Sequence, residues 1–181
     1  QQTEEFYDFY KNKMIFLDAK PNKAHLKLAE MERAGKLSAI VTQNIDGLHQ
    51  AAGSKNVFEL HGSVHRNYCQ KCGKFFDVNY VVNAKGVPYC DECGGIIKPD
   101  VVLYEEGLDS QTINGAVRAI SKADMLIIGG TSLVVYPAAG MIDYFKGKYL
   151  AVLNRDATSR DKQADLCITD PIGEVLGRIR V

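Results

Sequence analysis

The sequence has no excess of charge of either sign and no long apolar run. Both absences limit the partners that the chain can bind. Its 22 Lys and Arg residues balance 22 Asp and Glu residues, so the formal net charge at pH 7 is zero. A neutral chain has no general electrostatic attraction for DNA, RNA or an anionic membrane surface. No apolar run approaches the roughly 20 residues that a membrane helix needs, and no signal-peptide pattern is present. We therefore expect a cytoplasmic protein that binds neither nucleic acid nor membrane.

An initiating methionine is also absent. The chain begins at Gln1 and enters helix-like sequence at once, with Phe6, Tyr10 and Met14 at helical spacing. We therefore expect the start of the natural protein to be missing. The remaining 181 residues are enough to bury a sizeable core, and a content of 46% apolar and 24% charged residues is ordinary for a globular domain.

Four of the five cysteines form two close pairs. Cys69 and Cys72 make one C-x-x-C motif and Cys90 and Cys93 make another, with 17 residues between the pairs. This spacing is typical of a structural zinc site, in which four thiolates close a tetrahedron around one ion. The alternative is two disulfides, which belong to secreted domains. Because nothing else marks the chain as secreted, the spacing favours one structural Zn2+ per chain.

The fifth cysteine stands alone. Cys167 lies in the apolar run Asp165–Ile168, where an isolated thiol usually behaves as a small hydrophobic group. We therefore expect Cys167 to be a buried core residue.

Outside the cysteine-rich segment, helix patterns alternate with strand patterns. The expected helices are 4–14, 23–34 with Asn22 as its cap, 109–122, 137–145 and 172–179, and the expected strands are 37–41, 57–60, 125–128, 149–153 and 166–168. This alternation predicts an α/β fold with a doubly wound, Rossmann-like parallel sheet. Residues 66–97 interrupt the alternation and are expected to form a small inserted zinc-ribbon module.

Polar residues cluster where the predicted strands end, which is where ligands bind in such a sheet. These groups are Thr42–His49, His61-Gly62-Ser63, Gly129-Gly130-Thr131-Ser132 and Asn154. Their amide, carboxylate, imidazole and hydroxyl groups suit a sugar-rich ligand that forms many hydrogen bonds. Each group alone is a weak signal, since Gly129–Ser132 is equally well explained as a plain turn or as a cradle for a phosphate or ribose.

In combination, these segments resemble the signature of the sirtuin family in its bacterial type. The matching segments, in order, are TQNIDGLHQAAG at 42–53, ELHGS at 59–63, the paired C-x-x-C motifs, KPDVV at 98–102, GTSL at 130–133 and YPA at 136–138. Two departures stand out. The family's opening Gly-Ala-Gly-x-Ser loop and its Pro-Asp-Phe-Arg segment have no counterpart, and Glu105-Glu106 stands where the family usually has Gly-Glu.

The resemblance implies an NAD-dependent protein-lysine deacylase, with NAD+ as co-substrate and acyl-lysine peptides or proteins as substrates. The acyl-lysine carbonyl oxygen attacks the nicotinamide ribose, nicotinamide leaves, and the products are free lysine and O-acyl-ADP-ribose. His61 matches the catalytic histidine, and an imidazole can accept a proton near neutral pH. An isolated histidine is more often structural, but the setting of His61 at a strand end beside Gly62 favours the catalytic role. His25, His49 and His65 lack that support.

The same resemblance implies the remaining site residues. Gln43 and Asn44 hold the nicotinamide ribose and order the catalytic site, while Ile45 and Asp46 receive nicotinamide. The residues implied on the adenosine side of NAD are Gly130, Thr131, Ser132, Asn154 and Ile172. The residues implied for the acyl-lysine substrate are Val101, Val102, Leu103 and Tyr104, of which 101–103 add the peptide as a strand. An ordinary core strand is the alternative for 101–103, and a solvated turn is the alternative for Glu105 and Glu106.

The implied domains are a Rossmann-like NAD-binding domain of residues 1–65 and 98–181 and a zinc-binding module of residues 66–97. Within the first, residues 1–20 belong to a helical small-domain module. Because four cysteines fill the zinc tetrahedron, the metal is structural and not catalytic.

Other functions stay open at this point. A zinc ribbon that binds nucleic acid shares the cysteine spacing, but the lysines between Cys69 and Cys93 are matched by carboxylates. A non-catalytic reader of NAD or acyl-lysine needs no counterpart of His61. A mono-ADP-ribosyltransferase of the same family is distinguished from a deacylase by the absence of free O-acyl-ADP-ribose.

We predict that residues 1–181 made alone do not turn over NAD at a useful rate. A doubly wound nucleotide site normally begins with a strand, a glycine-rich turn and a helix whose N–H groups receive the pyrophosphate. The measurement compares NAD affinity and nicotinamide release for residues 1–181 and for the natural full-length protein with an acetyl-lysine peptide. Equal values for the two proteins would contradict this prediction.

Overall fold

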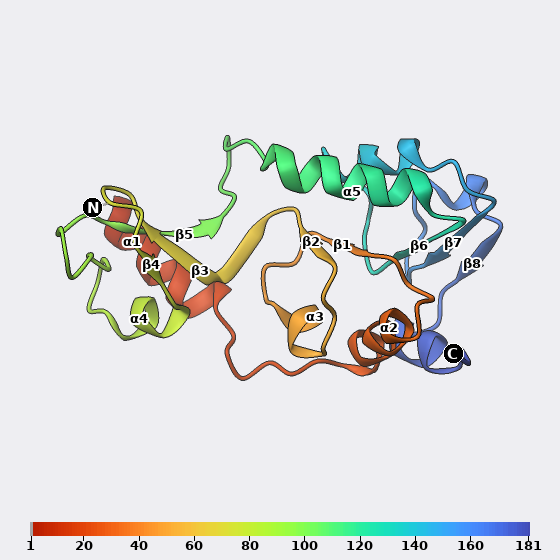
Figure 1. Cartoon of the computed structure of the whole chain (residues 1–181), viewed down its shortest axis with the longest axis horizontal. Coiled ribbons are helices and arrows are strands. Elements are labelled where there is room, and N and C mark those ends of the chain that lie inside the picture. The colour runs from red at the N-terminus through yellow and green to blue at the C-terminus, as the bar shows by residue number, and fades with distance from the viewer. Residues whose placement is uncertain (1) are drawn as a thin grey trace. The chain divides into compact units, whose positions relative to one another are not determined.

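The computed structural model describes residues 2–181 and divides the chain into two compact units (Figure 1). The first unit contains the chain up to Ala19 together with Asn44–Gly47 and His61–Gly107. The second unit contains Lys20–Gln43, Leu48–Leu60 and Leu108–Val181. Each unit thus gathers segments that lie far apart in the sequence.

The second unit holds the parallel strands. β1 (Ile40–Thr42) pairs with β2 (Val57–Glu59), and β6 (Met125–Gly129), β7 (Tyr149–Leu153) and β8 (Leu166–Ile168) form a sheet in that order. The prediction of a Rossmann-like α/β fold with parallel strands is confirmed. The parallel strands form two sheets, because among the described residues β1 pairs only with β2 and β6 pairs only with β7.

Helices cover both faces of the three-stranded sheet. Alternate residues of β7 point to opposite faces, so Ala151 and Leu153 belong to one apolar cluster and Leu150 and Val152 to another. The first cluster includes residues of α2 (Lys23–Arg33) and α6 (Ile172–Gly177). The second includes Ile142 of η2 (Ala138–Tyr144). The doubly wound arrangement follows from this alternation.

The other elements of this unit are α5 (Ser110–Lys122), α3 (Leu48–Ala51) and the short turn η3 (Asp161–Gln163). Ala116 and Ile120 of α5 pack with Val41 and Phe58, which come from β1 and β2. The long helix therefore buries the two-stranded sheet.

Two helices of the second unit begin at side-chain caps. Asn22 Oδ1 accepts hydrogen bonds from the backbone N–H groups of Ala24 (2.9 Å) and His25 (3.1 Å), while His25 Nδ1 lies 3.2 Å from the Asn22 backbone nitrogen. This reciprocal capping box satisfies donors that the helix itself leaves unpaired. Asp109 caps α5 by accepting the Thr112 N–H, at 2.7 Å, without a reciprocal side-chain bond at its own N–H.

The first unit is built on an antiparallel sheet that the helix-strand alternation did not predict. β3 (Gly62–Cys69) lies between β4 (Phe75–Phe76) and β5 (Ile97–Val101). The helical elements are α1 (Gln2–Phe9), the π-helical turn η1 (Tyr10–Met14) and α4 (Val78–Asn83).

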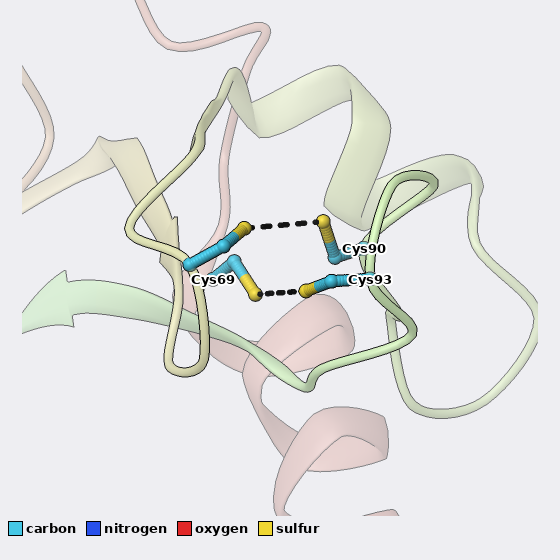
Figure 2. Close-up of side chains that lie close together, drawn as sticks. Cys69, Cys90 and Cys93 are labelled. Carbon is cyan, nitrogen blue, oxygen red and sulfur yellow. Dashed lines mark hydrogen bonds between the residues drawn. The ribbon is translucent and has the colours of Figure 1, made fainter.

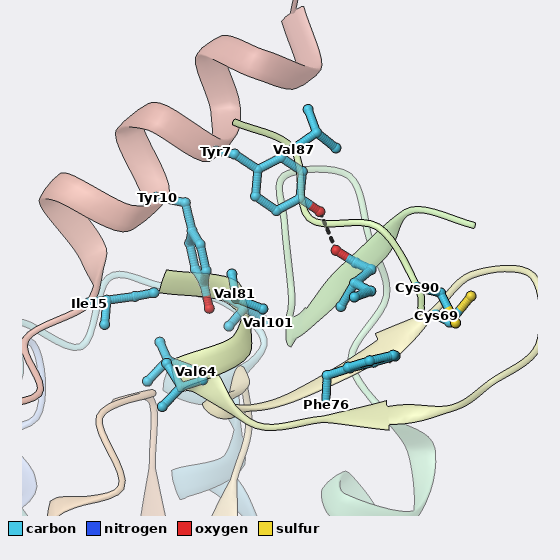
Figure 3. Packing of buried hydrophobic residues seen from close by; sticks show 12 residues of the cluster. Tyr7, Tyr10, Ile15, Val64, Cys69, Phe76, Val81, Val87, Cys90 and Val101 are labelled. Atoms are coloured by element: carbon cyan, nitrogen blue, oxygen red, sulfur yellow. Dashed lines mark hydrogen bonds between the residues drawn. The ribbon is translucent and has the colours of Figure 1, made fainter. Parts of the chain in front are cut away.

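Figure 3 shows the core that these elements share, in which the Tyr7 hydroxyl donates a hydrogen bond to the Ile97 carbonyl. Desolvation by burial raises the pKa of Tyr7 to about 12, so this hydroxyl keeps its proton at neutral pH.

The helix expected at 137–145 is present as η2, a 3-10 helix whose hydrogen bonds include i to i−3 pairs such as Gly140 N–H to Pro137 O. One expectation from the sequence is wrong. Cys167 is exposed and not buried, because β8 is an edge strand of its sheet, where Leu166 is exposed as well. None of the helices within residues 2–181 has the length and hydropathy that crossing a bilayer requires.

The capping box generates a stability prediction. Asn22→Ala removes the acceptor of two backbone N–H groups, so we expect the free energy of unfolding to fall by about 1 kcal/mol and Tm to fall by roughly 2–4 °C. Thermal unfolding followed by circular dichroism measures the shift. Asn22→Asp keeps the acceptor oxygen and serves as the matched control. A Tm for Asn22→Ala equal to that of wild type would show that the cap contributes nothing.

Candidate functional site

The four paired cysteines converge on one point of the first unit. The sulfur atoms of Cys69, Cys72, Cys90 and Cys93 all lie within 4.8 Å of one another. The Cys69–Cys93 sulfurs are 3.4 Å apart and the Cys72–Cys90 sulfurs are 3.7 Å apart. Figure 2 shows the side chains of Cys69, Cys90 and Cys93 lying close together. A disulfide needs a sulfur separation of about 2.05 Å, so the geometry excludes the alternative of two disulfides.

The two C-x-x-C motifs fold as matching turns. The Gly73 N–H donates to the Cys69 carbonyl at 2.9 Å, and the Gly94 N–H donates to the Cys90 carbonyl at 3.0 Å. Gly73 has φ +75 and Gly94 has φ +67, which is backbone that L side chains rarely adopt. Glycine after each motif therefore lets both sulfurs of a pair face the same point.

Backbone N–H donors lower the pKa values of the thiols, whereas neighbouring sulfur atoms can raise them. Desolvation raises the pKa of Cys69, but the N–H groups of Cys72 and Lys71 point at its sulfur and outweigh that effect, lowering the pKa to about 6. The Lys74 N–H lowers the pKa of Cys72, yet the neighbouring sulfurs of Cys93 and Cys69 outweigh it and raise the pKa to about 12. A cation among the sulfurs would offset the repulsion that raises the pKa of Cys72.

Zinc fits this donor set. A tetrahedral ion with Zn–S bonds of about 2.3 Å places its ligand sulfurs about 3.8 Å apart, which is close to the sulfur separations of 3.4 and 3.7 Å in the structure. A divalent ion also supplies the charge that makes four thiolates favourable. Cys69, Cys72, Cys90 and Cys93 would hold the ion with no ligand position left for water.

A charged contact joins the two cysteine turns. The Lys74 ammonium lies 2.8 Å from a carboxylate oxygen of Asp91 and 2.9 Å from one of Glu92. Lys74 follows the first cysteine pair, and both carboxylates lie inside the second pair. The hydrogen bonds to Asp91 and Glu92 raise the pKa of Lys74.

His61 stands where β3 begins and next to the end of β5. Its carbonyl accepts a hydrogen bond from the Val102 N–H at 3.1 Å. The next residue, Gly62, has φ +76, and a Cβ there would collide with the Asp100 carbonyl oxygen. Only glycine lets the two backbones approach this closely. The pairing of Gly62 with Val101 thus fixes His61 beside the predicted peptide segment 101–104.

The segment predicted to bind the acyl-lysine peptide is a strand end and not a core strand over its whole length. Val101 is the last residue of β5, while Val102 and Leu103 are half-buried beyond it and Tyr104 is fully exposed. Among the described residues β5 pairs with no strand other than β3, but its other edge is partly occupied, because the Ile97 N–H donates to the Pro88 carbonyl and the Ile97 carbonyl accepts the Tyr7 hydroxyl.

Glu106 is more than part of a solvated turn. Its carboxylate accepts a hydrogen bond from the Leu103 N–H at 3.0 Å. The same carboxylate forms an ion pair with the Lys98 ammonium at 3.0 Å. The Leu103 N–H, followed by Lys98, lowers the pKa of Glu106. The preceding Glu105 has φ +71, a conformation that favours glycine. In the sequence, the only sign of this unusual turn is Glu105 at the position where the family usually has glycine.

The loop Asn44–Gly47 belongs to the same unit as His61. The Ile45 carbonyl accepts the Val64 N–H at 3.0 Å, and the Ile45 side chain packs against the core of this unit. The structure therefore brings Asn44, Ile45 and Asp46 into one unit with His61 and Val101–Tyr104.

The residues predicted for the adenosine side lie at the carboxyl ends of parallel strands in the second unit. The Gly130 N–H donates to the Leu153 carbonyl at 3.1 Å, and the Asn154 N–H donates to the Ile168 carbonyl at 3.1 Å. Gly129 lies against the Ile172 side chain, so close that a Cβ on Gly129 would overlap it. The ends of β6, β7 and β8 thus bring Gly130, Asn154 and Ile172 together.

Thr131 and Ser132 complete that turn. Thr131 Oγ1 accepts the Leu133 N–H at 3.2 Å, and Ser132 is exposed. Gln43 follows the end of β1 in the same unit. The roles of all these residues toward NAD remain predictions.

Comparison with known proteins places these features in a family. Residues 1–137 match the model of the Sir2 family. The NAD-dependent protein deacetylase of Clostridium acetobutylicum is 66% identical over 175 residues, which cover 96% of this chain and 71% of that protein. The protein of the same name from Clostridium perfringens is 64% identical, with coverage of 97% of this chain and 72% of the relative.

Solved structures agree. A Sir2 structure with a p53 peptide and NAD+ superposes with a TM-score of 0.88 at 41% identity, covering 97% of this chain and 75% of that one. A Sir2 complex with an inhibitor, 2'-O-acetyl-ADP-ribose and a deacetylated p53 peptide gives a TM-score of 0.87 at 42% identity, covering 97% of this chain and 77% of that one.

The cysteine cluster generates a metal prediction. Cys90→Ala leaves three ligands and is expected to lose the zinc and to lower Tm by at least about 5 °C, because a structural site contributes several kcal/mol to folding and each kcal/mol shifts Tm by roughly 2–4 °C. Metal analysis of protein purified under reducing conditions measures one zinc per wild-type chain. Cys167→Ala, which changes the exposed fifth cysteine, should keep both the zinc and the Tm. Wild-type protein without zinc would refute the site.

Proposed function

The chain belongs to the Sir2 family, and on that premise we propose that it acts as an NAD-dependent protein-lysine deacetylase or deacylase. Relatives more than 60% identical over nearly the whole chain carry the name NAD-dependent protein deacetylase. NAD+ is consumed as a co-substrate, and an acyl-lysine peptide or protein is the second substrate. The products are deacylated lysine, nicotinamide and O-acyl-ADP-ribose.

In the proposed reaction the acyl-lysine carbonyl oxygen bonds to the anomeric carbon of the nicotinamide ribose. The bond between that carbon and nicotinamide breaks, and nicotinamide leaves with the bonding electrons. His61 then accepts the proton of a ribose hydroxyl as that hydroxyl attacks the imidate carbon. Water adds to the same carbon, the carbon–nitrogen bond breaks, and lysine leaves as the protonated amine, so that the acyl group remains on the ribose oxygen. Asn44 and Gln43 hold the ribose, and Asp46 accepts a hydrogen bond from the nicotinamide carboxamide beside Ile45.

One observation carries the proposal. The Val102 N–H donates to the His61 carbonyl at 3.1 Å, and Gly62 allows the backbones to meet there. The proposed base is therefore held beside the strand end that would receive the substrate backbone. The exposed Tyr104 and the position of Val102 and Leu103 beyond the end of β5 support binding of the acyl-lysine peptide along this segment.

The adenosine side of NAD is assigned to the second unit. Gly130, Thr131, Ser132, Asn154 and Ile172 lie at the carboxyl ends of parallel strands, where nucleotides bind in doubly wound sheets. Zinc would hold the cysteine turns in place and would take no part in the chemistry.

The domain division and the location belong to the same proposal. Residues 66–97 are assigned to the zinc-binding module and residues 1–65 and 98–181 to the NAD-binding domain. A cytoplasmic location is supported by five cysteines that form no disulfide.

The test of the proposal is His61→Ala in the natural full-length protein. We expect NAD and peptide binding to stay close to wild type while turnover of an acetyl-lysine peptide falls by about two or more orders of magnitude, as losses of a general base commonly do. Mass spectrometry of the products separates deacylation from other activities, since only a deacylase releases O-acyl-ADP-ribose. Near-normal turnover in the variant would remove His61 from the mechanism. A wild-type protein that modifies its target with ADP-ribose instead would favour the transferase.

A further inference from the structure

Strand β3 contains an irregularity next to the loop Asn44–Gly47. Ser63 pairs with Asp100 and Asn67 pairs with Pro99, so the register of β3 against β5 shifts between Ser63 and Asn67. Bulges of this kind re-aim side chains and often lie beside functional sites. Here the bulge contains Val64 and His65, and both contact the loop.

Two hydrogen bonds join this bulge to the loop. The Val64 N–H donates to the Ile45 carbonyl at 3.0 Å, and His65 Nε2 lies 3.0 Å from the Asp46 carbonyl oxygen. Because a carbonyl oxygen only accepts, His65 Nε2 must carry the hydrogen. The backbone of His65 is itself anchored, since its N–H lies 3.2 Å from the hydroxyl of the buried Ser63.

The imidazole also packs directly on the loop backbone. Gly47 has φ +69, and a Cβ on Gly47 would lie 2.7 Å from His65 Cδ2 and 2.9 Å from His65 Nε2. Real Cβ atoms do not approach other atoms that closely. The side chain of His65 therefore covers Gly47 and bonds to the adjacent carbonyl, so it contacts two successive residues of the loop.

We propose that His65 is a positioning residue that fixes the Asn44–Gly47 loop from outside the reacting centre. The inference rests on the proposed function, in which Asp46 receives the nicotinamide carboxamide. Holding the Asp46 carbonyl and the Gly47 backbone fixes the direction of the Asp46 side chain. His65 touches neither substrate in this scheme and acts through the loop.

The chain offers a matched set of variants. In His65→Gln the side-chain amide nitrogen stands the same number of bonds from the backbone as Nε2 and donates the same hydrogen bond. His65→Leu keeps much of the bulk over Gly47 but has no donor. Asn79→Ala, at an exposed position of α4, is the control for a polar surface substitution in the same unit.

The experiment measures steady-state kinetics of the natural full-length protein with an acetyl-lysine peptide. For His65→Leu we expect the KM for NAD and the inhibition constant of nicotinamide to rise about three- to tenfold, the scale of one lost hydrogen bond. The effect stays partial because the Val64–Ile45 bond remains. His65→Gln and Asn79→Ala should stay within about twofold of wild type. The KM for the peptide, the zinc content and Tm should not move in any variant.

Several outcomes overturn the inference. An unchanged KM for NAD in His65→Leu would show that the loop does not depend on this side chain. Equal defects in His65→Leu and His65→Gln would show that the hydrogen bond is not the cause. A parallel loss of peptide affinity, zinc and Tm would show that His65 supports the whole unit and not the loop.

A second readout separates this inference from the proposed function. Amide hydrogen exchange of residues 44–47 in the ligand-free protein should be faster in His65→Leu and unchanged in His65→Gln. If wild type releases no nicotinamide from NAD, the proposed function fails, and the exchange rates still decide whether His65 holds the loop. Equal exchange rates in wild type and His65→Leu would end the inference in either case.

Discussion

The convergence of four sulfurs is the constraint on which the first unit depends. Cys69 is the last residue of β3, and Cys90 and Cys93 precede β5. The cluster therefore brings together the two ends of the chain segment that connects these strands. Cys69 and Cys90 are also members of the apolar core that includes Tyr7 and Tyr10. A core of this size supplies little stability by itself. One ion held by the four thiolates would close this connecting segment next to the Cys69–Ile97 pair of β3 and β5, in the same ladder that ends at Gly62 beside His61.

In the second unit, the residues proposed to bind NAD are positioned by the ends of parallel strands and not by a metal cluster. Glycine ends β6 and Asn154 follows the end of β7, and the backbone groups there bond between neighbouring strands. Gly129 and Gly130 leave room at the end of β6, and Ile172 fills part of it. The order of the strands, more than any single side chain, brings Gly130, Asn154 and Ile172 to one edge.

Much of this architecture could be predicted because burial leaves a clear pattern. The strands at 149–153 and 166–168 have the predicted bounds, and Asn22 caps its helix as expected. The antiparallel strand 62–69 could not be found by the same rule. Its exposed His65 and Tyr68 interrupt the apolar run. The bulge between Ser63 and Asn67 also breaks the alternation of buried and exposed side chains that marks a strand. Cys167 was placed wrongly because an apolar run does not reveal that its strand lies at the end of a sheet.

The site predictions show a similar limit. The four cysteines converge as predicted because their spacing alone specifies a metal cluster. The contact of His65 with the loop could not be predicted, because the residues next to His65 in the sequence do not indicate that it lies on Gly47, 18 residues earlier. Only the bulge, which is a property of pairing between distant segments, turns the imidazole toward that loop.

Backbone conformation explains why glycines recur around the proposed catalytic residues. Gly62 permits the close approach to Asp100 that holds His61, and Gly47 permits the imidazole of His65 to lie on the loop. Glu105 is the contrasting case, because it adopts φ +71 with a side chain attached, at a cost of about 1 kcal/mol. The turn persists because Glu106 bonds to the Leu103 N–H and to Lys98. Strain at one residue is thus offset by the charge of the next, and the segment expected to receive the substrate peptide is held by an ionised carboxylate.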